Sequence, residues 1–143
     1  MKALINKLFN VGNYPENISI SLLFLRVVAG VFMITHGYGK LLMLFGDGPV
    51  KFADPLGIGI TASLILTVLA EFLCSIFLIF GVATRLSAIP LLITMLVAAL
   101  VIHAPDAFAR KELALLYSAI YAFIAVAGPG KYSADNWIFN NLK

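Results

Sequence analysis

Three ionisable side chains, Arg26, His36 and Lys40, interrupt an apolar stretch at residues 19–42. The stretch is long enough to cross a bilayer as a helix, which needs about 20 residues. Charges inside such a helix are costly and normally face a protein interior or a water-filled cavity. At about 100° per residue, Arg26 and Lys40 share one stripe with Gly37, and His36 lies at its edge. The sequence therefore predicts a crowded polar helix face that donates hydrogen bonds and exchanges protons.

A second apolar stretch, residues 62–82, contains one acidic residue, Glu71. Counted at about 1.5 Å per residue, Arg26 lies about 10 Å and Glu71 about 16 Å from the membrane side that holds both termini. A long arginine side chain spans this difference. We predict an Arg26–Glu71 ion pair, because either charge alone would be uncompensated in a low-dielectric interior. The alternative is that such a pair only fixes the register of the two helices.

Polar residues from the ends of three apolar stretches are expected to meet at the opposite membrane side: His36, Lys40, His103, Lys111, Glu112 and Tyr117. In this group His36, Lys40 and Tyr117 are candidate hydrogen-bond donors, and Glu112 and Glu71 are candidate proton relays. A plainer interpretation is that the lysines extend to the lipid headgroups, the second histidine only ends a helix, and the tyrosine packs at the interface.

Several cofactor and partner classes are not expected. The two histidines and the glutamates lack the H-x-x-x-H or E-x-x-H spacing of helical metal sites, so no metal is predicted. The single cysteine, Cys74, excludes an internal disulfide and an iron–sulfur cluster bound by this chain alone. Haem-attachment, nucleotide-loop and serine-nucleophile motifs are absent from the sequence. A net charge of +3 without a basic run does not predict nucleic-acid binding.

Four apolar stretches must position these residues, at about 19–42, 62–82, 86–103 and 112–128. The chain of 143 residues is 62% hydrophobic and 12% charged, whereas soluble domains average about 25% charged residues. We therefore predict one all-α domain over residues 1–143, an integral membrane four-transmembrane-helix bundle in a lipid bilayer. Ser19 is the expected N-cap of the first span.

The flanking and connecting segments give weaker expectations. Short interfacial helices are predicted at residues 3–9 and after Ser133. The one long connection, residues 43–61, is predicted either to cover a cavity or to be an exposed loop. Lysine and arginine number five on the side of the termini and four on the other side, which only slightly favours cytoplasmic termini. No cleavable signal peptide is apparent.

The order of short motifs along the chain resembles the DoxX family (DoxX/DoxD-like), small four-helix bacterial membrane proteins. The motifs are LRVVAGVFMITHGYGKL at 25–41, Glu71, GVATR at 81–85, His103, KEL at 111–113 and GPGKYSAD at 128–135. Each motif is weak alone, but their common order from about Leu22 to Trp137 is fairly specific. The family's polar positions would then be Arg26, His36, Gly37, Lys40, Glu71, Arg85, Lys111, Glu112, Tyr132 and Asp135.

This resemblance implies a multi-pass protein of the bacterial cytoplasmic (inner) membrane. The family takes its name from a subunit of a thiosulfate:quinone oxidoreductase. The implied function is a membrane subunit of an oxidoreductase that binds a quinone, as substrate, or a sulfur or thiol compound in a polar intramembrane cavity. Electrons would pass between bound substrates or through a partner oxidoreductase subunit, and a homo-oligomer is the other expected assembly. No metal, haem or nucleotide is expected.

On this hypothesis the catalytic residues are His36, Lys40, Glu71 and Glu112. The substrate-binding residues are Arg26, Tyr117, Lys111, His103 and Arg85. The alternative hypothesis is a non-enzymatic membrane scaffold or small-solute carrier whose buried charges are structural. A proton-coupled transporter is less favoured, because four short helices without internal repeats leave little room for alternating access.

Overall fold

The structure, a computed structural model, describes residues 11–141 and is helical without strands over that range. Its elements are α2 (Glu16–Phe45), α3 (Ile60–Val68), η1 (Leu69–Cys74), α4 (Ser75–Phe80), α5 (Thr84–Val97), η2 (Ala98–Ile102), α6 (Phe108–Ala127) and α7 (Ala134–Asn141). The elements η1 and η2 are π-helical turns, so α3–η1–α4 and α5–η2 each form one continuous helical rod.

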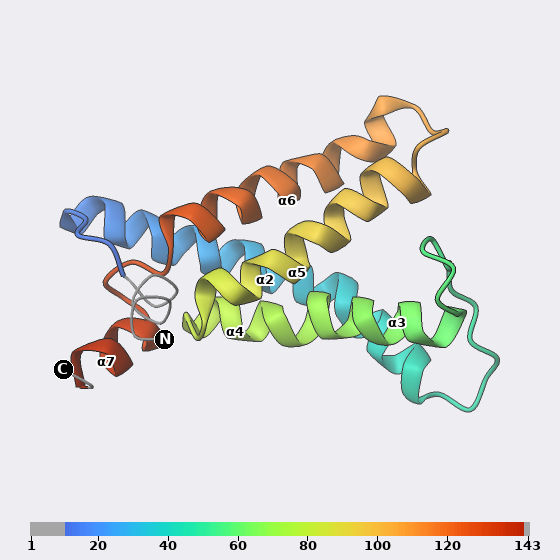
Figure 1. Cartoon of the computed structure of the whole chain (residues 1–143), viewed down its shortest axis with the longest axis horizontal. Coiled ribbons are helices and arrows are strands. Elements are labelled where there is room, and N and C mark those ends of the chain that lie inside the picture. The colour runs from blue at the N-terminus through green and yellow to red at the C-terminus, as the bar shows by residue number, and fades with distance from the viewer. Residues whose placement is uncertain (1–10, 142–143) are drawn as a thin grey trace.

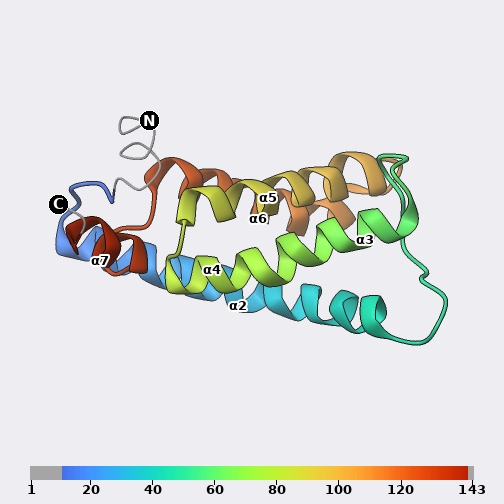
Figure 2. The same cartoon turned by 60° about the horizontal axis from the view of Figure 1, so that its bottom comes forward.

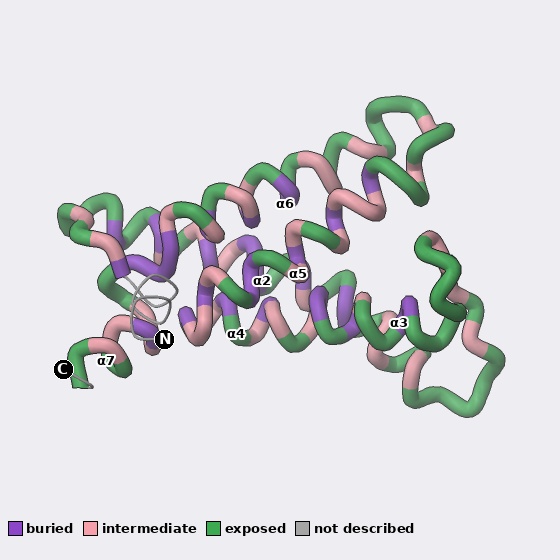
Figure 3. Tube along the Cα trace, viewed as in Figure 1, coloured by how far each residue is buried: buried purple, intermediate pink, exposed green. Residues whose placement is uncertain are grey.

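The rods form two layers, each made of two antiparallel rods (Figure 2). In one layer α2 lies along α3–η1–α4, and in the other α5–η2 lies along α6. The layers converge near α7 and diverge toward the loop at 46–59 (Figure 1). Buried positions concentrate where the layers converge, and exposed positions dominate the diverging end (Figure 3). Any cavity between the layers is therefore expected at the diverging end.

Within residues 11–141, three helical stretches are long and apolar enough to cross a membrane: Glu16–Phe45, Ile60–Phe80 and Thr84–Ile102. Large apolar side chains on them face outward; Phe24 is 69% exposed and Phe80 is 66% exposed, as expected for lipid contact. Helix α6 has 20 residues, but Arg110, Lys111 and Glu112 charge its first turns. The fourth span at 112–128 therefore stays a prediction.

The helix boundaries differ from the predicted ones by a few residues. One difference concerns Ser19, which is not an N-cap: α2 begins at Glu16 after Pro15, and Ser19 is buried inside the helix. The second and third spans each begin two residues earlier than predicted, at Ile60 and Thr84. Proline fixes the backbone where a helix starts, which explains the earlier beginning of α2.

The two predicted interfacial helices have different outcomes. The one at 3–9 lies outside the described residues. The C-terminal one is present as α7, where the Ser133 hydroxyl accepts a hydrogen bond from the Asn136 amide at 3.2 Å and Trp137 is 71% exposed. This helix begins as the sequence predicts.

The converging end is held by charged side chains that bind backbone groups. The buried Arg26 guanidinium donates to the carbonyls of Leu78 at 3.3 Å and Tyr132 at 2.5 Å. The buried Asp135 carboxylate accepts from the amides of Ala83 at 2.6 Å and Thr84 at 2.8 Å, where an anion complements the N-terminus of α5. The charge of Asp135 also attracts Arg26. This network ties the C-terminal segment to three helices.

Arg85 has a similar structural role at the converging end, where it binds the C-terminus of α6. Its guanidinium donates to the carbonyls of Ala125 at 2.8 Å and Ala127 at 3.2 Å, and also to that of Val126. These are among the last carbonyls of α6, which lack partners within the helix. Arg85 therefore caps α6 and joins it to α5.

Glycines set the distance between α2 and its neighbour in the same layer. A Cβ atom on Gly37 would lie 2.8 Å from the carbonyl carbon of Glu71 and 2.8 Å from the amide nitrogen of Phe72. A Cβ on Gly30 would lie 3.0 Å from the carbonyl oxygen of Ser75. At Gly37 all of the nearest neighbours are backbone atoms, so only glycine permits this approach, whereas at Gly30 the nearest atom belongs to the side chain of Ile79. The crowding that the sequence predicts on this face of the helix is confirmed at Gly37.

We predict that Gly37→Ala lowers the free energy of unfolding by about 1–3 kcal/mol, because the new methyl group must displace backbone rather than a flexible side chain. Gly39→Ala is the matched control, since nothing lies within 4 Å of its Cβ position. That change should be neutral or stabilising by up to about 1 kcal/mol. Unfolding in mixed micelles measures both. Equal stability of the two variants would contradict the close approach.

Candidate functional site

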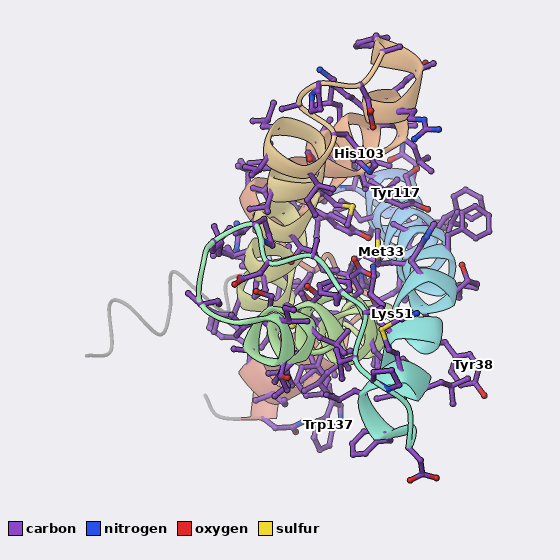
Figure 4. All side chains as sticks on the ribbon, turned by 90° about the vertical axis from the view of Figure 1, so that its right-hand side faces the viewer. Met33, Tyr38, Lys51, His103, Tyr117 and Trp137 are labelled. Carbon is purple, nitrogen blue, oxygen red and sulfur yellow. The ribbon has the colours of Figure 1, made fainter. Side chains whose placement is uncertain are left out.

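A cavity of about 220 Å³ lies between the two layers at the diverging end. Its walls come from α2, η1, the α5–η2 rod and α6: Met33, His36, Lys40, Glu71, Met95, Ala98, His103, Arg110, Leu113, Ala114 and Tyr117. We call it the polar cavity. Figure 4, viewed from this end, shows Met33, Tyr117 and His103 following one another between α2 and the α5–α6 layer. The structure thus brings together five of the predicted site residues.

An ion pair between Lys40 and Glu71 lies in the wall of the polar cavity. The Glu71 side chain is 3% exposed and that of Lys40 is 26% exposed. A buried carboxylate needs such a partner, because an uncompensated charge in a protein interior is strongly destabilising. The pair therefore places a buried, charge-compensated carboxylate in the wall of the cavity.

The predicted Arg26–Glu71 ion pair is wrong. Arg26 binds the Leu78 carbonyl instead, seven residues and about 10 Å of helix beyond Glu71. The depth estimate assumed that α2 and α4 end at the same level. In the structure α2 extends past the end of α4 (Figure 1), and the hydrogen bond to Leu78 places the Arg26 side chain at the last turn of α4. Glu71 lies nearer the C-terminal end of α2, where the Lys40 side chain forms an ion pair with it.

Aromatic rings line the side of the polar cavity that α2 and α6 form. The rings of His36 and Tyr117 meet edge to face, with centroids 6.4 Å apart and an interplanar angle of 81°. The Tyr117 ring stacks on Tyr121 at 5.9 Å. Tyr117 is buried, whereas His36 is exposed at the cavity mouth. These contacts fix the ring of Tyr117 and leave a polar aromatic wall.

His103 and Asp106 form a pair at the mouth of the cavity that the sequence analysis did not identify. The Nδ1 atom of His103 lies 2.8 Å from Oδ2 of Asp106, and Nη1 of Arg110 lies 3.8 Å from the same oxygen. The hydrogen bond with His103 is the main cause that lowers the pKa of Asp106, with a smaller contribution from the charge of Arg110. The sequence HAPD at residues 103–106, which places a carboxylate three residues after the histidine, was the signal that could have indicated this pair.

Both π-helical turns lie beside the cavity. The turn η1 contains Glu71, and η2 ends next to His103, whose amide donates to the Ala98 carbonyl at 2.9 Å in the i→i−5 pattern. A π-turn inserts an extra residue and rotates the side chains that follow, and such turns are frequent at functional sites. Nothing in the sequence signals either turn.

A second cavity, of about 370 Å³, lies on the other side of the Lys40–Glu71 pair. Its lining is mostly apolar: Lys40, Phe52, Ala53, Pro55, Leu56, Ile58, Ser63, Leu66, Thr67, Glu71, Ile93, Thr94, Val97, Ala98, Ile102 and His103. We call it the apolar cavity. Lys40, Glu71, Ala98 and His103 line both cavities. The connection at 46–59 contributes five of the lining residues. Of the two predictions for this connection, a cavity cover or an exposed loop, the structure favours the cavity cover.

Asp54 holds this connection against the start of α3. Its carboxylate accepts hydrogen bonds from the Ile58 amide at 3.0 Å, the Gly59 amide at 2.8 Å and the Ser63 hydroxyl at 2.8 Å. The bond from Ser63, followed by that from Gly59, lowers the pKa of Asp54 below its usual range. The ionised carboxylate is therefore the form that keeps the loop in place.

The other predicted site residues lie elsewhere. Glu112 is exposed and lines neither cavity. The Lys111 ammonium donates to the Ala104 carbonyl at 2.7 Å, beyond the cavity lining. Arg26 and Arg85 belong to the converging end. Over residues 11–141, no group of three His, Cys, Asp or Glu side chains is arranged to hold a metal ion.

The fold and the site define a helical membrane protein with a cavity of ionisable residues between its helices. Comparison with known proteins gives the family. A sequence profile of the DoxX family matches residues 21–104, and the chain belongs to this family. The chain is also 34% identical over 131 residues to a protein of Haemophilus influenzae described as an uncharacterized protein, with 82% of this chain and 90% of the relative covered. Comparison with solved structures gave no significant match.

Double-mutant cycles should show that Glu71 is coupled to Lys40 and not to Arg26. For Lys40→Met and Glu71→Gln, which alter one ion pair, we expect a coupling energy of at least about 1 kcal/mol in unfolding. For Arg26→Met and Glu71→Gln, which share no partner, the effects should add within about 0.5 kcal/mol. Reversible unfolding in mixed micelles measures both cycles. Strong coupling in the second cycle would restore the rejected Arg26–Glu71 contact.

The loop at 46–59 should loosen in acid. Because the folded-state pKa of Asp54 lies below its unfolded value of about 3.9, its stabilisation is complete above about pH 4 and is lost as pH falls through the folded value. We expect pepsin cleavage in this loop to increase over that acidic interval in the wild type. Asp54→Asn, which does not titrate, should show no such step, and Asp47→Asn should behave as the wild type.

Proposed function

We propose that this chain is a quinone-binding membrane subunit of an oxidoreductase, with the quinone ring in the polar cavity. The observation that carries the proposal is the pairing of the cavity's charges, which leaves a neutral site rich in hydrogen-bond donors. As part of the same proposal, α6 completes a four-span bundle in a bacterial inner membrane, with both termini in the cytoplasm.

Charge pairing favours a neutral ligand over a sulfur oxyanion. Lys40 is neutralised by Glu71, and Arg110 lies beside Asp106. An anion entering the cavity would have to break one of these pairs or accept repulsion from a carboxylate. Two like charges about 4 Å apart cost about 4 kcal/mol at an effective dielectric constant of 20. A neutral quinone ring meets no such cost, although a sulfur compound remains a substrate for the partner subunit.

The size of the polar cavity suits one substituted ring. An apolar cavity of roughly 150 Å³ engineered into another protein binds benzene. At about 220 Å³, the polar cavity has room for a ring that also carries carbonyl oxygens and small substituents. Buried apolar walls from Met33 and Met95 complement the ring faces.

The lining residues match the chemistry of quinone reduction. Carbonyl oxygens accept hydrogen bonds, and His36, Lys40 and Tyr117 supply donors from two helices. Formation of a quinol consumes two protons with two electrons. Glu71 and His103 are the proposed proton-exchanging groups. The electrons are proposed to come from a sulfur or thiol compound that a partner subunit oxidises.

The structural alternative, a scaffold with charges that only join helices, is supported at the converging end alone. There Arg26, Arg85 and Asp135 bind backbone groups and line neither cavity. The ion pair at the diverging end differs, because Lys40 and Glu71 border open volume on both sides. We therefore assign a structural role to the first group and ligand binding to the second.

Quinone binding tests the proposal directly. The purified protein should retain quinone, detected by solvent extraction and chromatography, and should bind an added short-chain quinone saturably. Tyr117→Phe keeps the stacked ring and removes one hydroxyl. We expect it to weaken binding about 5–10-fold, the value of one hydrogen bond of about 1 kcal/mol.

The matched control is Tyr38→Phe, because Tyr38 projects outward from the other side of α2 and is 53% exposed (Figure 4). Its affinity for quinone should equal that of the wild type. A wild-type protein without retained quinone and without saturable binding would overturn the proposal. An equal loss of quinone affinity in both tyrosine variants would show that the quinone ring does not bind in the polar cavity.

A further inference from the structure

We infer that the apolar cavity is the binding site for the polyisoprenoid tail of the quinone whose ring occupies the polar cavity. This inference rests on the proposed function and deepens it. It assigns the ligand class as a tailed membrane quinone rather than a small soluble one. It also gives a role to the loop at 46–59, which the ring site alone does not use.

The two cavities adjoin at a shared wall. Lys40, Glu71, Ala98 and His103 line both of them. Ala98 contributes only a methyl group to this wall, and it begins the π-turn η2. A molecule with a polar ring and an apolar tail can therefore place the ring on one side of the Lys40–Glu71 pair and the tail on the other.

Away from the shared wall, the apolar cavity offers hydrocarbon surface. Leu56, Leu66, Ile93 and Val97 are among its lining residues. Its two hydroxyl groups near α3 already have partners. The Ser63 hydroxyl donates to Asp54 at 2.8 Å, and the Thr67 hydroxyl donates to the Ser63 carbonyl at 2.8 Å. A branched hydrocarbon chain thus displaces no protein hydrogen bond at these two groups.

The rim of the apolar cavity is open toward lipid. Leu66 on α3 is 53% exposed, Ile93 on α5 is 55% exposed and Ile102 on η2 is 40% exposed. These helices belong to the stretches that are apolar enough to span a membrane. They also belong to opposite layers, which diverge at this end (Figure 1). A tail longer than the cavity can leave between them into the bilayer.

The loop at 46–59 completes the enclosure. Phe52, Pro55 and Leu56 line the cavity from this loop, and Asp54 holds the loop against Ser63 at the start of α3. Large apolar residues in a connecting loop are costly in water, but here three of them line a cavity. The loop therefore forms part of the wall of the apolar cavity.

Quinones that differ only in the tail test this inference. Binding of 2,3-dimethoxy-5-methyl-1,4-benzoquinone and of its decyl-tailed form is measured to the full chain in phosphatidylcholine nanodiscs. We expect Val97→Trp, which fills the apolar cavity, to weaken binding of the decyl-tailed quinone at least about 10-fold. Binding of the tailless ring should stay within about 2-fold of the wild-type value. Because the variant is compared with the wild type in identical discs, partitioning of the tail into lipid cancels.

The matched control is Leu100→Trp, since Leu100 lies on the same rod, is 61% exposed and lines neither cavity. It should bind both quinones as the wild type does. Thr94→Leu, a smaller filling of the same cavity, gives the test if Val97→Trp does not fold; it should reduce the preference for the tailed quinone in the same direction. Both variants are checked by size-exclusion chromatography and thermal melting.

The outcomes separate this inference from the proposed function. If the wild type binds neither quinone, the proposed function fails. If both bind but the filled variants keep the full preference for the tailed form, the ring site stands and the tail site is overturned. Release of a co-purified phospholipid by Val97→Trp, with that preference unchanged, would assign the cavity to an acyl chain and also overturn the inference.

Discussion

The close contact between α2 and η1 is the constraint on which the rest of the diverging end depends. Gly37 allows the backbone of α2 to touch that of Glu71, and Lys40, one turn later on α2, neutralises the Glu71 carboxylate. A wider separation would leave this buried carboxylate without its partner, at a cost of several kcal/mol. The same contact fixes the position of the wall that the two cavities share. Helix packing, electrostatics and cavity shape are thus set by one short stretch of α2.

The two ends of the molecule divide the polar residues between different tasks. At the converging end, Arg26, Arg85 and Asp135 bind backbone groups of several elements and line neither the polar nor the apolar cavity. This rigid end lets the layers separate at the other end without loss of the fold. There the polar side chains bind one another and border cavities, so they remain available to a ligand. A preorganised site of this kind requires one fixed end and one open end.

The sequence predicted residue types and helices better than contacts. Apolar length gave the helical class, and helical periodicity gave the buried face with Arg26, Gly37 and Lys40, because both depend on local pattern. The partner of Glu71 was predicted wrongly, because it depends on how far α2 extends past α4. Asp106 was missed as the partner of His103, and Glu112 was placed in the site although it is exposed, because the turn after η2 and the orientation of α6, which begins at Phe108, decide which side chains face inward. Long-range register and π-turns have no reliable signal in a single sequence.

The closed converging end argues for a binding site rather than a transport path. A carrier must expose its site alternately to both membrane sides. In the described part of the chain, the polar cavity stops at Met33 and Met95. Beyond them lies a core of buried side chains: Ala29, Leu78, Ala88, Leu91, Tyr121 and Ile124. Opening a path there would separate the groups that Arg26 and Asp135 hold together. A ligand that enters from the lipid side and leaves by the same route needs no such opening, which favours a membrane-soluble molecule over a transported solute.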